Sequence, residues 1–138
     1  MDNNKKIMQQ KLLEYQLLQQ HIENLQQQLQ FLNQQVIEIA KLNEDLSSLE
    51  NSKQGKEIFS QLGPGIYVKA DLKESKNVLF NIGSGILVNK TVKEANSLLG
   101  KQQEEIFRSI TALEEQFKKV FDRVQELQEE IKSLQASS

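Results

Sequence analysis

The sequence has no cysteine and only one histidine, His21. The missing cysteine excludes a disulfide framework, a thiolate metal site and a thiol nucleophile, and a single histidine leaves little basis for a metal centre. No apolar run approaches the roughly 20 residues that cross a bilayer, and residues 1–6 lead into a glutamine-rich stretch instead of an apolar signal segment. We therefore expect no metal, no cofactor and no membrane partner, and a cytoplasmic location.

The charges show no excess of one sign that would attract a polyanion. Seventeen Lys and Arg residues are balanced by nineteen Asp and Glu residues, which gives a net charge of −2. Counted by segment, residues 1–57 carry −2, residues 58–90 carry +2 and residues 91–138 carry −2. Dedicated nucleic-acid-binding domains usually carry a basic excess, so we expect no nucleic-acid partner.

Glycine and proline are confined to one part of the chain. All six glycines and the only proline lie between Gly55 and Gly100, and the flanking segments repeat apolar residues at spacings of three and four. This heptad pattern predicts two long coiled-coil helices, each with an apolar seam. The first seam consists of Met8, Tyr15, Leu18, Ile22, Leu25, Leu29, Leu32, Val36, Ile39 and Leu46, with Lys11 and Asn43 as its polar exceptions. The second seam consists of Val92, Leu99, Ile106, Ile110, Leu113, Phe117, Val120, Val124, Leu127, Ile131 and Leu134.

The middle of the chain changes to a period of two. Apolar residues alternate with other residues over residues 66–72, 78–82 and 86–89, with a weaker run over residues 58–62. This pattern predicts four strands. Because glycine tolerates positive φ, Gly63-Pro64-Gly65 and Gly83-Ser84-Gly85 predict two tight hairpin turns.

These patterns together predict a mainly α-helical chain with a β insert. Residues 1–54 and 91–138 form an antiparallel two-helix coiled-coil hairpin, and residues 55–90 form two tandem β-hairpins at the end opposite the termini. An isolated two-stranded hairpin is marginal in water, so we expect strands from several subunits to join an inter-subunit β-barrel. Its core would consist of Ile66, Val68, Val78, Phe80, Ile86 and Val88. In the alternative, the strands pack on the chain's own helices at Phe31, Ile37 or Phe107.

Apolar residues outside the first seam mark the start of the chain. They are Ile7, Leu12, Leu13 and Leu17. Exposed apolar residues at a splayed tip would form a nonspecific adhesive surface for other apolar chains. In the alternative, the terminus is frayed or shifted in register, with Leu12 in place of Lys11 in the seam.

The sequence contains no recognisable catalytic constellation. Each Gly-x-Gly tripeptide is followed by a strand pattern and lacks the Lys-Ser/Thr of a nucleotide-binding loop. His21 has no second ligand at metal spacing, and adjacent acids such as Glu104 and Glu105 diverge by about 100° around a helix. We therefore expect that the protein is not an enzyme.

Residues 55–70, GKEIFSQLGPGIYVKA, and residues 78–91, VLFNIGSGILVNKT, resemble the α-type subunit of prefoldin in its archaeal form. The flanking heptads extend the resemblance over the whole chain. It implies an ATP-independent holdase, in which two α-type and four β-type subunits form a hexamer, bind non-native proteins at coiled-coil tips and pass them to a group II chaperonin. The implied client surface consists of Ile7, Met8, Leu12, Leu13, Leu17, Leu127, Ile131 and Leu134. The competing hypothesis is a structural or tethering coiled coil with a fixed native partner.

Overall fold

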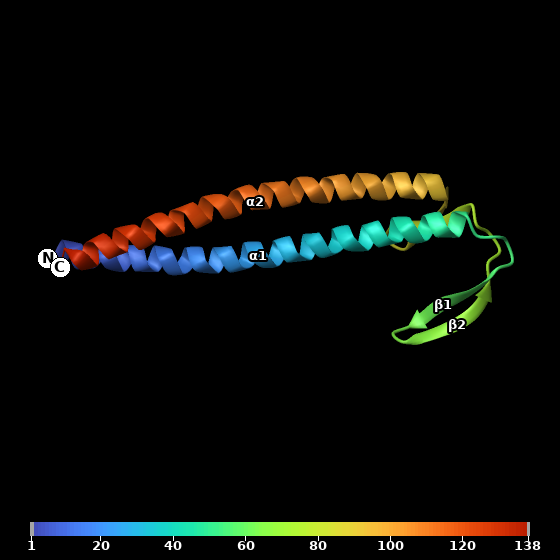
Figure 1. The fold of residues 1–138 in the computed structure, drawn as a ribbon, viewed down its shortest axis with the longest axis horizontal. Helices are drawn as coiled ribbons and strands as arrows, with labels where there is room; N and C mark the ends of the chain where they lie inside the picture. The colour runs from blue at the N-terminus through green and yellow to red at the C-terminus, as the bar shows by residue number, and fades with distance from the viewer. Residues whose placement is uncertain (1, 138) are drawn as a thin grey trace. The chain divides into compact units, whose positions relative to one another are not determined.

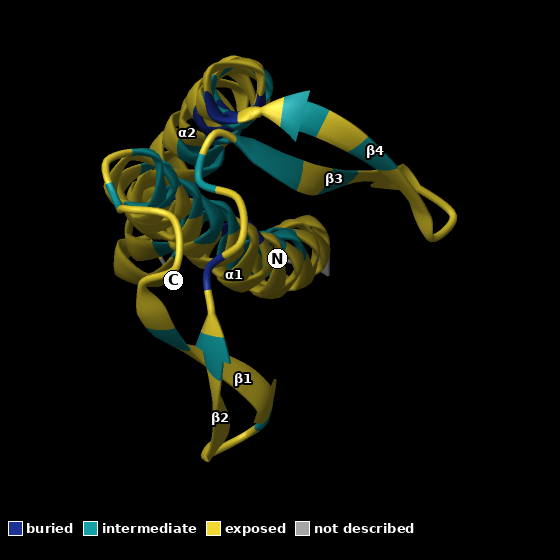
Figure 2. Ribbon diagram, turned by 90° about the vertical axis from the view of Figure 1, so that its right-hand side faces the viewer, coloured by how far each residue is buried: buried dark blue, intermediate teal, exposed yellow. Residues whose placement is uncertain are grey.

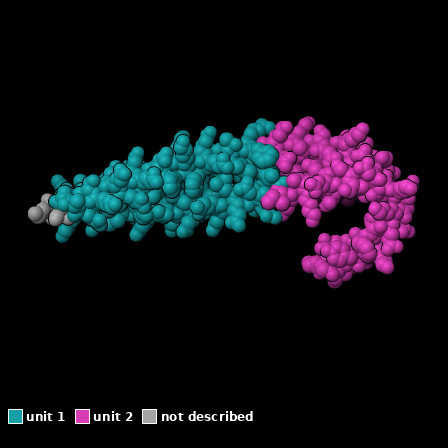
Figure 3. Space-filling model, viewed as in Figure 1, with its two compact units in different colours: residues 1–36, 105–138 teal, residues 37–104 magenta. Residues whose placement is uncertain are grey.

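The computed structural model describes residues 2–137 and places six elements in them. They are α1 (Asp2–Glu50), β1 (Glu57–Gly63), β2 (Ile66–Asp71), β3 (Asn77–Gly83), β4 (Ile86–Thr91) and α2 (Val92–Ala136); Figure 1 labels α1, α2, β1 and β2, and Figure 2 also labels β3 and β4. Two long helices and two antiparallel strand hairpins confirm the predicted fold class. The chain divides into two compact units, one of residues 1–36 with 105–138 and the other of residues 37–104 (Figure 3).

In the first unit, α1 and α2 pack against each other as an antiparallel coiled coil. Residues near the start of α1 contact residues near the end of α2, as Lys11 does with Glu130 and Tyr15 with Gln128. The predicted seam residues of this unit are all buried or half-buried. Fully burying one large apolar side chain contributes roughly 1.5–3 kcal/mol, so the seam holds the two helices together.

Each unit has buried apolar side chains of its own. In the described part of the chain they are Leu25, Leu72, Val92, Ala95, Leu99, Ile110, Val124 and Leu127. Most of them follow one another along the helices, and most of the remaining surface is exposed or half-buried, as the colours of Figure 2 show.

In the second unit, Lys76 connects the end of α1 with the start of α2. Its ammonium group donates a hydrogen bond to the carbonyl of Glu50 at 3.2 Å, and its own carbonyl accepts one from the amide of Val92 at 2.9 Å. The hydroxyl of Thr91 accepts a hydrogen bond from the amide of Glu94 at 3.1 Å, which caps the first turn of α2. Free backbone groups at both helix ends therefore have partners.

Each hairpin is a separate two-stranded antiparallel sheet, with β1 paired to β2 and β3 paired to β4. In both sheets the register shifts just before the turn, at Leu62 and at Ile82, as in a β-bulge. The turns themselves differ. Ser84 and Gly85 have φ of 52° and 75°, typical of a type I′ turn, whereas Pro64 precedes Gly65 at 75° in a type II pattern.

Candidate binding and assembly surfaces

The start of α1 exposes a group of apolar side chains in the first unit. Its members are Ile7, Leu12, Leu13 and Leu17, which we call the exposed tip set. Leu13 and Leu17 are each 58% exposed. Lys11 occupies the seam, because it is half-buried and pairs with Glu130, while Leu12 lies outside it. The structure therefore does not show the alternative register in which Leu12 replaces Lys11.

The other four predicted client-binding residues belong to the seam between the helices. Met8, Ile131 and Leu134 are half-buried, and Leu127 is fully buried. The structure thus divides the predicted site into an exposed set on α1 and a seam set shared by both helices. Leu127 reaches a binding partner only where the helices separate.

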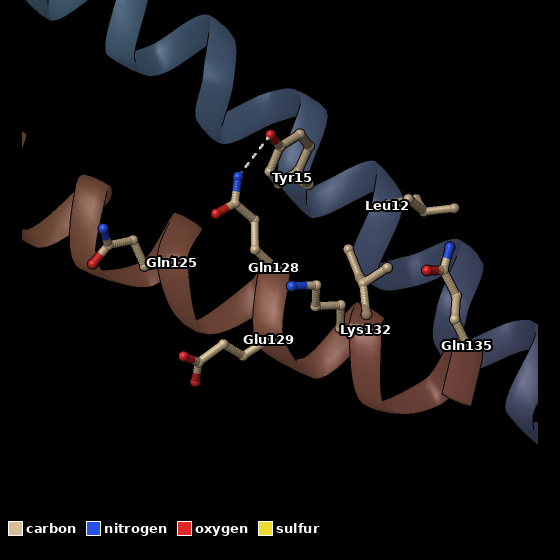
Figure 4. A pocket seen from close by; sticks show the side chains of 8 residues that line it. Leu12, Tyr15, Gln125, Gln128, Glu129, Lys132 and Gln135 are labelled. Atoms are coloured by element: carbon tan, nitrogen blue, oxygen red, sulfur yellow. Dashed lines mark hydrogen bonds between the residues drawn. The ribbon is translucent and has the colours of Figure 1, made fainter. Parts of the chain in front are cut away.

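An open groove of about 700 Å³ lies next to the exposed tip set, and Leu12 forms part of it. Its lining residues are Leu12, Tyr15, Gln125, Gln128, Glu129, Ile131, Lys132 and Gln135. Figure 4 shows that these side chains come from both helices, and that the amide of Gln128 donates a hydrogen bond to the hydroxyl of Tyr15 at 3.2 Å. Sequence reasoning missed this groove because it depends on which residues of α2 lie beside Leu12.

A network of ion pairs joins the two helices in the same unit. The guanidinium of Arg123 holds both carboxylate oxygens of Glu14, at 2.9 and 3.2 Å, and also reaches Glu126 at 3.0 Å and Glu130 at 3.4 Å. Lys11 donates to the other carboxylate oxygen of Glu130. Bidentate pairing of arginine with a carboxylate adds geometric specificity, so this network favours one alignment of α1 against α2.

The network changes the acidity of its carboxyl groups. The hydrogen bond from Arg123 lowers the pKa of Glu14, and the hydrogen bond from Lys11 lowers the pKa of Glu130; partial desolvation opposes both shifts. The pKa of Arg123 is raised in turn, chiefly by its hydrogen bonds to Glu14 and Glu126. Glu14, Glu130 and Arg123 are therefore charged at neutral pH.

The hairpins of the second unit leave their predicted barrel residues largely uncovered. Ile66, Val68 and Ile86 are exposed in the single chain, while Val78, Phe80 and Val88 are half-buried. Because each sheet has only two strands, every strand has one unpaired edge.

The alternative in which the strands pack on the chain's own helices names Phe31, Ile37 and Phe107, and all three are exposed.

The structure also places the remaining motifs of the sequence. Both Gly-x-Gly tripeptides form hairpin turns that lead into β2 and β4, and His21 is exposed. Residues 2–137 contain no group of three or more His, Asp and Glu side chains placed to hold a metal ion. Within those residues, neither helix combines the length and the apolar character needed to cross a membrane.

The chain is a two-helix coiled coil with two strand hairpins, and it exposes apolar residues on its helices and on its strands. The family model of the prefoldin subunit matches residues 18–137. The chain therefore belongs to the prefoldin family, a family of non-enzymatic chaperone subunits, and its role is of the chaperone type.

A solved structure shows the same fold. A filamentous PFD from Methanocaldococcus jannaschii matches with a TM-score of 0.75 and 17% identity, covering 83% of this chain and 94% of its own. The prefoldin beta subunit from Thermococcus strain KS-1 matches with a TM-score of 0.39 and 23% identity, covering 86% of this chain and 90% of its own. No curated protein matches the chain.

Proposed function

We propose that the chain is an α-type prefoldin subunit that acts as an ATP-independent holdase in the cytoplasm. The observation that carries this proposal is the exposed tip set, with Leu12 at the edge of an open groove between the two helices. An uncovered apolar surface beside a groove suits the apolar segments that native proteins bury and non-native proteins expose. Met8, Leu127, Ile131 and Leu134 would join this surface when the first turns of α1 separate from the last turns of α2.

Residues 55–90 are the oligomerisation platform in this proposal. The unpaired strand edges and the exposed Ile66, Val68 and Ile86 support it, because both features are expected of strands completed by other subunits. The partners would be β-type prefoldin subunits, in a hexamer of two α-type and four β-type chains. The assembly would transfer its bound client to a group II chaperonin.

The test of holdase activity uses the assembled oligomer without nucleotide and several unrelated, chemically unfolded proteins. We expect light scattering to show that it suppresses their aggregation at near-stoichiometric ratio. Replacing Ile7, Leu12 and Leu13 together by serine should remove most of this suppression. The matched control is Leu42→Ser, which alters an exposed apolar residue of α1 outside the tip set.

Two results would contradict the proposal. If the unaltered oligomer binds one native protein and ignores unfolded chains, the protein is a tether. If the triple serine variant suppresses aggregation as well as the unaltered oligomer does, the exposed tip set is not the client surface.

A further inference from the structure

The two helices of the first unit differ sharply in charge. Between Tyr15 and Val36, Glu23 is the only Asp, Glu, Lys or Arg, and the segment is rich in glutamine. The segment of equal length on α2, residues 105–126, carries nine charged residues. These are Glu105, Arg108, Glu114, Glu115, Lys118, Lys119, Asp122, Arg123 and Glu126. Glutamine is polar but uncharged, so the outer side of α1 is hydrated almost without charge, whereas the outer side of α2 is charged.

The uncharged part of α1 also exposes large apolar side chains. Phe31 is 63% exposed and Leu17 is 58% exposed, and both occupy the same heptad position two heptads apart. Two open grooves lie along this side of the helix. One, of about 390 Å³, includes Asn24, Gln28 and Phe31, and the other, of about 430 Å³, includes Leu17 and Gln20. We call the exposed side of α1 over residues 16–36 the neutral face.

The chemistry of the neutral face fits an extended, weakly charged polypeptide. Leu17 and Phe31 are about 21 Å apart along the helix axis, a distance that about six residues of extended chain cover. Glutamine side chains donate and accept hydrogen bonds, so they can pair with backbone groups that an unfolded chain has left without partners. Contact with apolar segments here requires almost no desolvation of charged groups, which is costly.

We propose that the neutral face of α1 is a second client-contact surface, which binds extended, uncharged apolar segments of non-native proteins. This inference rests on the proposed holdase function and extends its client surface along α1 from Leu17, a member of the exposed tip set, to Phe31. The charged side of α2 would remain in contact with solvent. The choice of client segment would then follow from the absence of charge on α1, rather than from specific pairing of side chains.

The experiment measures binding of a probe peptide to the assembled oligomer by fluorescence anisotropy. The probe contains Leu, Phe, Ser and Asn only, carries a neutral dye, and is long enough to reach from Leu17 to Phe31. In one variant Gln20, Gln27 and Gln34 are replaced by lysine, and in a second the same three residues are replaced by glutamate. All three are exposed positions of the neutral face, and lysine and glutamate retain good helix propensity.

The matched controls introduce the same charges on α2. Ser109, Ala112 and Gln116 are exposed and uncharged, and they are replaced together by lysine or together by glutamate. We expect both α1 variants to weaken probe binding by about fivefold or more, as loss of an important interface residue does, and both α2 controls to bind within about twofold of the unaltered oligomer. Phe31→Gln should weaken binding in the same way, while Phe31→Leu should preserve it.

The outcomes separate this inference from the holdase proposal. If the unaltered oligomer does not bind unfolded proteins, the proposed function fails. If it binds them and the α1 variants bind the probe like their α2 controls, the neutral face is not a client surface, although the function stands. If light scattering shows a smaller assembly for the α1 variants alone, the neutral face is a contact between subunits and the inference is overturned. Circular dichroism checks that every variant keeps its helices.

Discussion

Arg123 binds carboxylates from both helices, and this arrangement shows how one side chain can favour a particular helix alignment. Its guanidinium forms two hydrogen bonds to Glu14 on α1 and another to Glu126 on α2. Because these side chains are partly exposed, water and salt screen the attraction, and we expect its effect on stability to be small. Its main contribution is to geometry, since a displaced helix would lose the bidentate pairing.

The lowered pKa values of Glu14 and Glu130 predict a specific pH dependence. A carboxyl group with a lowered pKa in the folded state stabilises that state above its ordinary pKa, and the stabilisation is lost as the pH falls through the lowered value. The variant with Glu14→Gln and Glu130→Gln should therefore melt slightly below the unaltered protein at pH 7. The difference should shrink as the pH falls below about 4.3, the ordinary pKa of glutamate.

Thermal melts followed by circular dichroism between pH 7 and pH 3 measure this dependence. The control is Glu129→Gln, which removes a nearby carboxylate for which no ion pair is described. A gap between the melting temperatures that widens toward low pH would be inconsistent with the role of the two carboxylates.

At the scale of the element, the seam of the coiled coil determines the stability of the first unit. Replacing the fully buried Leu127 by alanine removes its contacts and leaves a cavity, which typically costs about 2–5 kcal/mol. Leu13→Ala alters a leucine that is 58% exposed, and such a surface change usually stays within about 0.5 kcal/mol. Urea unfolding of the two variants should show this contrast, and equal losses would mean that the seam is not the source of stability.

The two helices and four strands could be predicted from local signals. Heptad spacing predicted the seam, whose residues in the first unit are all buried or half-buried, and the glycines at 63–65 and 83–85 predicted the two turns. The groove beside Leu12 and the pairing of Glu14 with Arg123 could not be predicted in the same way. Both depend on the register between two helices far apart in sequence, which the heptad repeat alone leaves open.

The candidate site could be predicted only in part for the same reason. The off-seam positions of Leu13 and Leu17 already indicated exposure. The full burial of Leu127 follows from the packing of α2 against α1 in the folded chain, and the heptad pattern identified it only as a seam residue. The exposed and buried members of the predicted site were therefore not separated until the structure was known.

At the scale of the whole molecule, the hairpins are expected to need other chains. Val68→Asp or Phe80→Asp places a charge on a strand residue of the proposed barrel core, where desolvating that charge would be costly. We expect each variant to lose the oligomer while most of its helix content remains. Light scattering and circular dichroism measure the two properties, with Asn89→Asp as a control at an exposed strand position. An unchanged mass in the Val68 and Phe80 variants would exclude these residues from the assembly contact.

In the first unit the seam residues follow one another along the two helices, and this spacing affects how the coiled coil responds to mutation. Each layer of seam residues packs chiefly against the layers beside it. A destabilising substitution in one layer should therefore increase hydrogen exchange in the adjacent helix turns, while the amides of distant turns stay protected. Random mutations in α1 and α2 should consequently lower the stability of the helix turns near each mutation, instead of unfolding both helices at once.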